Sequence, residues 1–282
     1  GQGLRVLALG WRTADEGWQC LGLVGLRDPL RDGSVEAVKV AARAGIRTVI
    51  LTGDQRRTAE AIARQALLDG DVIEGADLPA LLAAPDAAER LRRVAAIARV
   101  APADKVAVVE ALRRAGEVVA MIGDGVNDAP ALRAADVGIA VGARSSDLAR
   151  QTADVVLEQA DLRSILAAVA EGRAVQDNLR RSVRFQAAGN LGELLLSLCT
   201  ALAGRRGLSS LGLLWINLLT DTLPGLALAL EPTEAGLLER PPAAPGAPLL
   251  ARDDWHDIAR DGALIAGASG IAAFAGGPLA AF

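Results

Sequence analysis

The segment GDGVND at 123–128 holds the side chains best suited to chemistry in this chain. It follows the apolar run Val118–Ile122, so we expect it to form a loop at the end of a strand. Asp124 and Asp128 are four residues apart on a turn that two glycines loosen. Mg²⁺ is commonly held by one or two carboxylates and keeps several waters. The loop therefore predicts a magnesium site.

Two further loops have side chains that suit a phosphate group. The sequence TGD at 52–54 follows the run Thr48–Leu51, and a small hydroxyl residue and a glycine at a strand end let backbone N–H groups approach an anion. Lys105 begins a helical pattern, where its ammonium can act as a point charge on a phosphoryl oxygen. An ordinary glycine turn and a solvated surface lysine are the alternatives. Together with 123–128, these loops on successive strand ends predict a phosphoryl-transfer site, and their order resembles that in haloacid-dehalogenase-type proteins.

Polar side chains also interrupt two apolar segments later in the chain. Asn190 and Glu193 lie on one helical face of the first, and Asn217, Thr220 and Asp221 lie on one face of the second. A central Asp in a membrane helix costs about 2.5–3.5 kcal/mol on insertion scales, so such residues are usually functional. Oxygen ligands without sulfur or imidazole suit Ca²⁺ or another hard cation. Hydrogen bonds that only hold the helices together are the alternative.

Strand-like and helix-like patterns alternate in the first part of the chain. Apolar runs of strand length are Leu4–Leu9, Leu21–Leu26, Arg47–Leu51, Val118–Ile122 and Val137–Val141. Helical patterns are Ser34–Ala44, Thr58–Leu67 and Lys105–Arg114, and Ala76–Glu89 is expected to be irregular or weakly helical. This alternation is typical of βαβ units. We predict an α/β domain with a Rossmann-type parallel sheet.

After residue 182 the chain becomes apolar. Val183–Ala203, Leu211–Leu230 and Gly262–Phe282 are each about as long as a bilayer's hydrocarbon core requires, roughly twenty residues for ~30 Å. We predict transmembrane helices at 183–204 and 208–230 and the start of another at 262–282, as a portion of an α-helical bundle. Helices buried in a soluble protein are the alternative. The arginines at 180, 181 and 184 favour a cytosolic flank before the first, whereas Arg205 and Arg206 in the short loop after it weaken this argument.

The composition excludes several classes of function. The formal net charge of −4 argues against a nucleic-acid-binding protein. Cys20 and Cys199 lie far apart, so the sequence contains neither a disulfide framework nor a CxxC metal site. The single histidine, His256, excludes a multi-histidine metal centre.

Several segments resemble the P-type (E1-E2) cation-transporting ATPases. LRDPLR at 26–31, GIRTVILTGD at 45–54 and ARVAPADK at 98–105 resemble motifs of their haloacid-dehalogenase-like phosphorylation domain, and residues 119–142 resemble its hinge motif almost letter for letter. NLGE at 190–193 and LWINLLTD at 214–221 are similar to the ion-binding helices of the calcium-transporting members, and ERPP at 239–242 is similar to the cytosolic loop that follows them.

The resemblance implies a role for each matching residue. Asp124 would bind Mg²⁺, Asn127 would help to hold the phosphoryl group, and Asp128 would support the loop and its metal. With Lys105, these are the implied catalytic residues. The implied contacts to ATP or its transferred phosphate are Thr52, Gly53, Asp54, Arg99, Lys105 and Asn127. Asp28 and Arg31 would form a hinge between domains. The implied cofactors are Mg²⁺ and ATP.

The resemblance also implies a division into parts. Residues 1–20 resemble the tail of a nucleotide-binding domain, 21–180 the phosphorylation domain, and 231–260 a cytosolic loop. The family's DKTGT motif, which carries the phosphorylated aspartate, and its TGE loop are absent from the sequence. Because acyl-phosphate chemistry needs a nucleophile, we expect this chain alone to be inactive and the remaining pump segments to be its partners.

The resemblance thus implies part of an ATP-driven cation pump that works through an aspartyl phosphate in a bilayer, with a bacterial plasma membrane as the expected location. Glu193 and Asp221 would neutralise one divalent charge, which favours Ca²⁺ over Na⁺, Mn²⁺ or Mg²⁺. Asn217 agrees with this, because sodium/potassium pumps carry an acid at that place. The alternatives are a non-catalytic, membrane-embedded remnant of a pump and, less favoured without a nucleophile motif, a membrane-anchored phosphatase.

Overall fold

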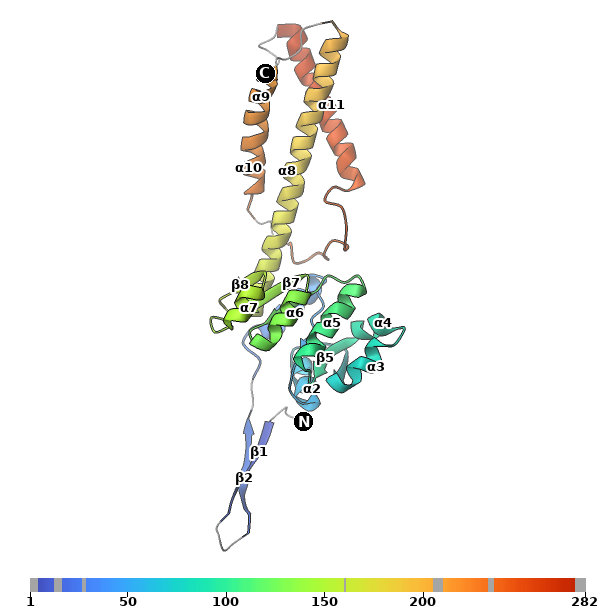
Figure 1. Cartoon of the computed structure of the whole chain (residues 1–282). Coiled ribbons are helices and arrows are strands. Elements are labelled where there is room, and N and C mark those ends of the chain that lie inside the picture. The colour runs from blue at the N-terminus through green and yellow to red at the C-terminus, as the bar shows by residue number, and fades with distance from the viewer. Residues whose placement is uncertain are drawn as a thin grey trace. The chain divides into compact units, whose positions relative to one another are not determined.

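The computed structural model describes residues 5–12, 17–26, 29–159, 161–204, 210–232 and 236–276 (Figure 1). Contacts within the chain divide it into two compact units. The first comprises Gly1–Ala168 and Leu238–Pro245, and the second comprises Val169–Leu237 and Gly246–Phe282. Asp28, one of the two expected hinge residues, lies outside the described residues.

The first unit alternates strands and helices along the chain. Its elements are β1 (Arg5–Trp11), β2 (Gln19–Leu26), α1 (Ser34–Arg43), β3 (Ile50–Leu51), α2 (Arg56–Gln65), β4 (Asp71–Glu74), the 3-10 helix η1 (Gly75–Asp77), α3 (Leu78–Leu82), α4 (Ala87–Arg92), β5 (Val94–Ala98), α5 (Pro102–Arg114), β6 (Ala120–Gly123), the 3-10 helix η2 (Val126–Asp128), α6 (Ala129–Ala134), β7 (Val137–Val141), α7 (Asp147–Thr152) and β8 (Val155–Leu157).

Two parallel three-stranded sheets form the centre of this unit, with strand orders β3-β5-β4 and β6-β7-β8. The predicted α/β fold with parallel sheets is therefore confirmed. Every residue of β5 is buried, as expected for a central parallel strand covered on both faces. Its alanines at 95, 96 and 98 pack against Ala59 and Ala63 of α2, and these small side chains let the helix lie close to the sheet.

Helix α5 joins the two sheets into one core. Val108 and Leu112 pack in the cluster around β5, whereas Val109 packs in the cluster around β6 and β7. Leu51 and Val119 contact both clusters. Figure 1 shows α5 beside α6, the helix that follows β6. The ends of β3, β5, β6 and β7 therefore belong to one continuous structure.

The first two apolar runs, Leu4–Leu9 and Leu21–Leu26, do not pair as the sequence predicts. They were expected within the parallel sheet, but β1 and β2 pair with each other as an antiparallel hairpin, with an irregularity between Leu9 and Gly10. The physical reason is the connection: the seven residues between the two strands are enough for a hairpin loop, whereas a parallel pair needs a crossover of a dozen residues or more.

The second unit is helical. It holds most of α8 (Leu162–Leu202), with α9 (Ser210–Ile216), the π-helix η3 (Asn217–Asp221), α10 (Thr222–Ala229) and α11 (Arg252–Gly276). The predicted spans at 183–204, 208–230 and 262–282 fall on these helices, but 208–209 and 277–282 lie outside the described residues. Among the residues that the structure describes, no helix has both the length and the apolar character that crossing a membrane requires.

The π-helix has a cause in the sequence. Pro224 has no N–H group, so it cannot donate the hydrogen bond that an α-helix would direct to the carbonyl of Thr220, four residues earlier. A local π-helical turn is one way to accommodate such a proline, and π-helical turns occur frequently at functional sites. The irregular backbone consequently lies at Asn217–Asp221, the polar stretch for which the sequence predicts ion ligands.

Candidate functional site

Backbone hydrogen bonds join the candidate loops in pairs. The N–H of Val100 donates to the carbonyl of Thr52 at 3.0 Å, and the N–H of Arg99 donates to the carbonyl of Asp54 at 2.9 Å. The N–H of Ser146 donates to the carbonyl of Asp124 at 2.9 Å. The loop after β3 is thus held by the loop after β5, and the loop after β6 by the loop after β7.

An ion pair connects these two pairs of loops. Lys105 Nζ, from the first turns of α5, lies 2.6 Å from Asp128 Oδ1 in η2. The two side chains are only 18% and 12% exposed, so water screens the pair weakly. Asp128 Oδ2 also accepts the Gly125 N–H at 3.3 Å. The carboxylate of Asp128 is therefore occupied in holding Lys105 and the glycine-rich turn.

Asp124 and Asn127 are both exposed beside this pair. Asp124 directly follows β6, so its exposed carboxylate lies on the loop for which the sequence predicts a magnesium site. The fit with Mg²⁺ is that of an open site, since this ion needs few protein carboxylates when phosphate oxygens and waters supply the other ligands. Among the described residues, no cluster of three or more His, Cys, Asp or Glu side chains could enclose a metal.

The remaining phosphate candidates lie on the β3 and β5 loops. Thr52 Oγ1 accepts the Asp54 N–H at 3.1 Å, and a Cβ built on exposed Gly53 would meet nothing within 4 Å. Arg99 is exposed and adopts a left-handed backbone conformation with φ of 52°. A Cβ on Gly75 would lie 2.8 Å from the Arg99 carbonyl oxygen, so the glycine leaves room for this conformation. Backbone strain of this kind is frequent at functional sites.

Two supporting residues were missed by the sequence analysis. Asp104 Oδ2 accepts the Ala101 N–H at 2.8 Å and so caps the helix that carries Lys105. Ser146 Oγ accepts the Ala149 N–H at 3.1 Å and begins α7, beside its backbone bond to Asp124. Their signals were an acid two residues after a helix-opening proline and a serine at a helix start.

Gly123 offers a test of how tightly this site is packed. A Cβ at Gly123 would lie 2.5 Å from the Cβ of Asp128 and 3.0 Å from its Oδ2. We expect Gly123→Ala to displace Asp128 and to lower the free energy of unfolding by about 1–3 kcal/mol. Gly53→Ala, where nothing would clash, is the control. Thermal unfolding of the chain would measure both, and equal melting temperatures would contradict the close packing.

The second candidate site lies in the helical unit, where Glu193 of α8 meets Asn217 of η3. With the amide nitrogen of Asn217 turned toward the carboxylate, it lies 2.7 and 2.8 Å from the two oxygens of Glu193. Turning the amide by half a turn places its oxygen there instead, because the two ends of an amide have the same shape. In that orientation both side chains would present oxygen to one cation.

The other predicted cation ligands are distributed around this pair. Asn190 is exposed and lies about one turn before Glu193 on α8. The side chains of Thr220 and Asp221 lie outside the described residues. Close contacts keep α8 against its neighbours: a Cβ on Gly225 would lie 2.9 Å from Gln186 Nε2, and a Cβ on Gly192 would lie 2.7 Å from the Ile265 side chain.

Comparisons with known protein families find a match in each half of the chain. A model of haloacid dehalogenase-like hydrolases matches residues 5–136, and a model of the C-terminus of cation transporting ATPases matches residues 206–280. The two matches together include the loops after β3, β5 and β6, Lys105, Asn217 and the helices that follow Asn217.

Curated relatives align across both regions. A calcium-transporting ATPase 1 of Bacillus cereus is 40% identical over 79% of this chain, and a probable cation-transporting ATPase F of Mycobacterium tuberculosis is 42% identical over 88%. A plasma membrane-type calcium-transporting ATPase 7 of rice, Oryza sativa, is 36% identical over 88%. The aligned parts are 25%, 30% and 25% of these relatives, so the chain spans about a quarter of their length. The chain belongs to the family of P-type cation-transporting ATPases and corresponds to a calcium-pump-like part of such proteins.

Proposed function

We propose that this chain forms the phosphoryl-transfer and cation-binding parts of an ATP-driven pump that moves Ca²⁺ across a membrane. In the complete pump, ATP phosphorylates an aspartate, and cation binding controls that step. Among the described strands, β3 and β6 are edge strands, and both lead into candidate loops. A strand from elsewhere in the pump can therefore add to either edge and bring the phosphorylated aspartate to this site.

The residues of the strand-end loops would have different roles in phosphoryl transfer. Asp124 would hold Mg²⁺, which neutralises charge on the phosphoryl oxygens when bound. Lys105 would place its positive charge on the same oxygens, and Asp128 fixes that ammonium at 2.6 Å. Asn127 would donate a hydrogen bond from its side-chain NH₂ group to the transferred phosphoryl group. Thr52, Gly53, Asp54 and Arg99 would bind the nucleotide's phosphates from the β3 and β5 loops.

The observation that carries the cation assignment is the pairing of Glu193 with Asn217. A carboxylate on α8 and an amide on a π-helical turn bring two hard oxygen ligands together from separate segments. The π-helix adds carbonyl groups that an α-helix would use internally. Glu193 and Asp221 would supply two negative charges for one divalent ion, with Asn190 and Thr220 as neutral oxygens. The curated relatives named as calcium-transporting ATPases support Ca²⁺.

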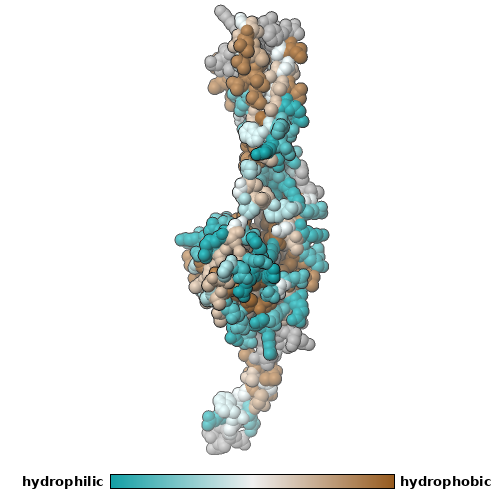
Figure 2. All heavy atoms as spheres, turned by 90° about the vertical axis from the view of Figure 1, so that its right-hand side faces the viewer, coloured by the Kyte–Doolittle hydropathy of each residue, from teal (hydrophilic) through white to brown (hydrophobic). Residues whose placement is uncertain are grey.

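The surface of the helical unit supports a membrane location. Exposed large apolar side chains occur on each of its helices, among them Leu198, Leu202, Leu214, Leu218, Leu226, Leu264 and Ile271. Figure 2 shows such side chains gathered over these helices, whereas hydrophilic side chains cover much of the visible face of the first unit. A large exposed apolar surface marks a membrane or protein contact. We propose that lipid and the remaining pump helices cover it in a plasma membrane, with bacteria as the proposed source.

Glu193→Gln in the full-length protein tests this proposal. The substitution keeps the shape of the side chain but removes the charge that attracts the cation. We expect the Ca²⁺ concentration for half-maximal phosphorylation by ATP to rise about tenfold or more, which corresponds to about 1.4 kcal/mol. Phosphorylation by inorganic phosphate, which needs an empty cation site, should remain.

The matched control is Glu171→Gln, which removes an exposed carboxylate from the same helix. It should leave the Ca²⁺ dependence unchanged. If Glu193→Gln and Asp221→Asn both behaved like this control, the polar residues would serve only to join helices and the cation assignment would be wrong.

A further inference from the structure

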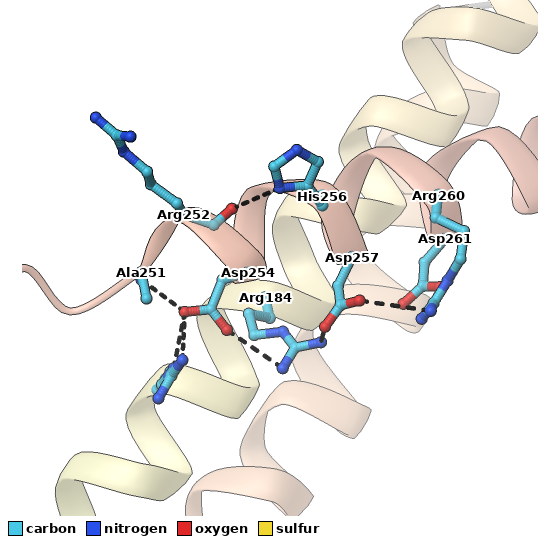
Figure 3. A network of polar contacts seen from close by, with 9 residues as sticks. Arg184, Ala251, Arg252, Asp254, His256, Asp257, Arg260 and Asp261 are labelled. Carbon is cyan, nitrogen blue, oxygen red and sulfur yellow. Dashed lines mark hydrogen bonds and ion pairs between the residues drawn. The ribbon is translucent and has the colours of Figure 1, made fainter.

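A buried carboxylate at the start of α11 binds two arginines of α8. Asp254 is 1% exposed, and its Oδ2 accepts hydrogen bonds from Arg180 Nε at 2.8 Å and from the Ala251 N–H at 2.7 Å. Its Oδ1 lies 3.3 Å from a terminal nitrogen of Arg184. Figure 3 shows Asp254 between its own helix start and the neighbouring helix. Donors from three residues thus converge on one side chain.

The cluster continues along both helices. Arg184 also donates to Asp257 Oδ2 at 2.7 Å, and Asp257 lies 3.4 Å from Arg260 (Figure 3). Arg180 and Arg184 are one turn apart on α8, and Asp254 and Asp257 are one turn apart on α11. Two charges on each helix therefore face two on the other, and the hydrogen bond from Arg180 lowers the pKa of Asp254.

This arrangement restricts α8 more than a surface ion pair would. If the arginines moved away, the buried carboxylate of Asp254 would keep an uncompensated charge, which is strongly unfavourable. Moving α8 out of this contact therefore costs a large amount of free energy. Planar guanidinium groups also impose a direction on each hydrogen bond. By comparison, Arg260 and Asp261 form an ion pair with side chains 64% and 41% exposed, the kind that contributes little.

The restrained residues lie on the same unbroken helix as the proposed cation ligands. Asn190 and Glu193 follow Arg184 by six and nine residues, which is about 9 and 13.5 Å along an α-helix. The helix α8 is continuous from Leu162 to Leu202. Contacts that fix its rotation and its position along its axis at Arg180 and Arg184 therefore also fix the position of Glu193. Glu193 in turn has to meet Asn217, which belongs to a different segment.

We infer that Asp254 is a positioning residue for cation binding: by locking α8 to the start of α11, it holds Glu193 where it meets Asn217. This inference rests on the proposed function of the Glu193 site. It assigns to α11 a part in cation affinity through its acidic first turns, although Asp254 itself contacts no proposed ligand in the described structure.

The test is Asp254→Asn in the full-length protein, with Asp253→Asn as the matched control. Asp253 is the exposed neighbour on the same helix turn, so its substitution makes the same chemical change outside the cluster. We expect Asp254→Asn to raise the Ca²⁺ concentration for half-maximal phosphorylation by ATP about three- to tenfold, because the ligands are then less preorganised. Asp253→Asn should not change it. Phosphorylation by inorganic phosphate should keep its level in both variants.

Arg184→Gln provides a second route to the same result, including the case in which Asp254→Asn does not fold. It should raise the half-activating Ca²⁺ concentration similarly, and the double variant should show less than the product of the two effects, because both residues act in one cluster.

Two results would overturn the inference. One is a half-activating concentration for Asp254→Asn and Arg184→Gln equal to that of Asp253→Asn. The other is an equal loss of both phosphorylation reactions with that concentration unchanged, which would mean that Asp254 serves only stability. Glu193→Gln, measured alongside, separates this from the proposed function: if it alone shifts the Ca²⁺ dependence, the cation site stands and only the role of Asp254 fails.

Discussion

Asp124→Asn in the full-length protein is expected to lower the rate of Mg²⁺-dependent phosphorylation by ATP about a thousandfold or more. Asp124 is the exposed carboxylate at the end of β6, whereas Asp128 is occupied by Lys105. An amide binds Mg²⁺ far more weakly than a carboxylate, and metal stabilisation of transition-state charge is worth several kcal/mol. Rapid-quench measurement of the phosphorylated protein over a range of Mg²⁺ concentrations would record the loss.

The control for this experiment is Asp86→Asn, an exposed aspartate in the loop before α4. It should retain the rate of the unsubstituted protein. Thermal unfolding of both variants should stay within the equivalent of about 0.5 kcal/mol, because neither carboxylate is buried. A normal phosphorylation rate for Asp124→Asn at low Mg²⁺ would show that another residue holds the metal.

The sequence predicts the parallel α/β architecture because its signals there are local and strong. Val137–Val141 forms a strand with the predicted bounds, and the helical pattern Ser34–Ala44 forms α1 with an end one residue earlier. The strands that the sequence analysis missed have weak local signals. β4 (DVIE) has two apolar residues, β8 is three residues long, and β5 (VAAIA) is mostly alanine, which is depleted in strands. Burial on both faces, a tertiary effect, makes β5 a strand.

Irregular backbone and long-range pairing were beyond the sequence analysis for a related reason. The pairing of β1 with β2 depends on the length of a loop rather than on either strand. The π-helix at Asn217–Asp221 depends on Pro224, whose effect reaches back by one turn. In each case the local pattern is satisfied by more than one structure, and a constraint elsewhere in the chain decides between them.

The candidate sites divide in the same way. Residue types and spacing are sufficient to nominate Asp124, Lys105 and Glu193, because each chemistry needs those side chains near a strand end or within an apolar helix. The partners are not readable from spacing. Lys105 and Asp128 are 23 residues apart, and Arg180 and Asp254 are 74 apart. These contacts exist only once the strands and helices have packed. The sequence therefore predicts the candidate residues, but not which carboxylate forms an ion pair with each lysine or arginine.

The pairing of Lys105 with Asp128 leads to the last prediction. Lys105→Met removes a positive charge and leaves the Asp128 carboxylate, 12% exposed, without its cation. We expect the free energy of unfolding to fall by about 2–4 kcal/mol, since breaking a largely buried pair leaves an uncompensated charge. Asp128→Asn alone should also destabilise the chain. The double variant should be less destabilised than the sum of the two, because it contains neither unpaired charge. Chemical unfolding of the chain and its three variants measures this cycle.

A surface ion pair provides the comparison. Arg56 Nε and Glu60 Oε1 lie 2.9 Å apart on α2, but their side chains are 51% and 36% exposed. Arg56→Met should therefore change stability by only about 0.5 kcal/mol. In the full-length protein, both Lys105→Met and Asp128→Asn should also slow phosphorylation, since Asp128 acts by holding the ammonium in place. An additive unfolding cycle, with Lys105→Met alone impaired in phosphorylation, would instead mean that Lys105 acts without Asp128 and that their contact contributes nothing to either property.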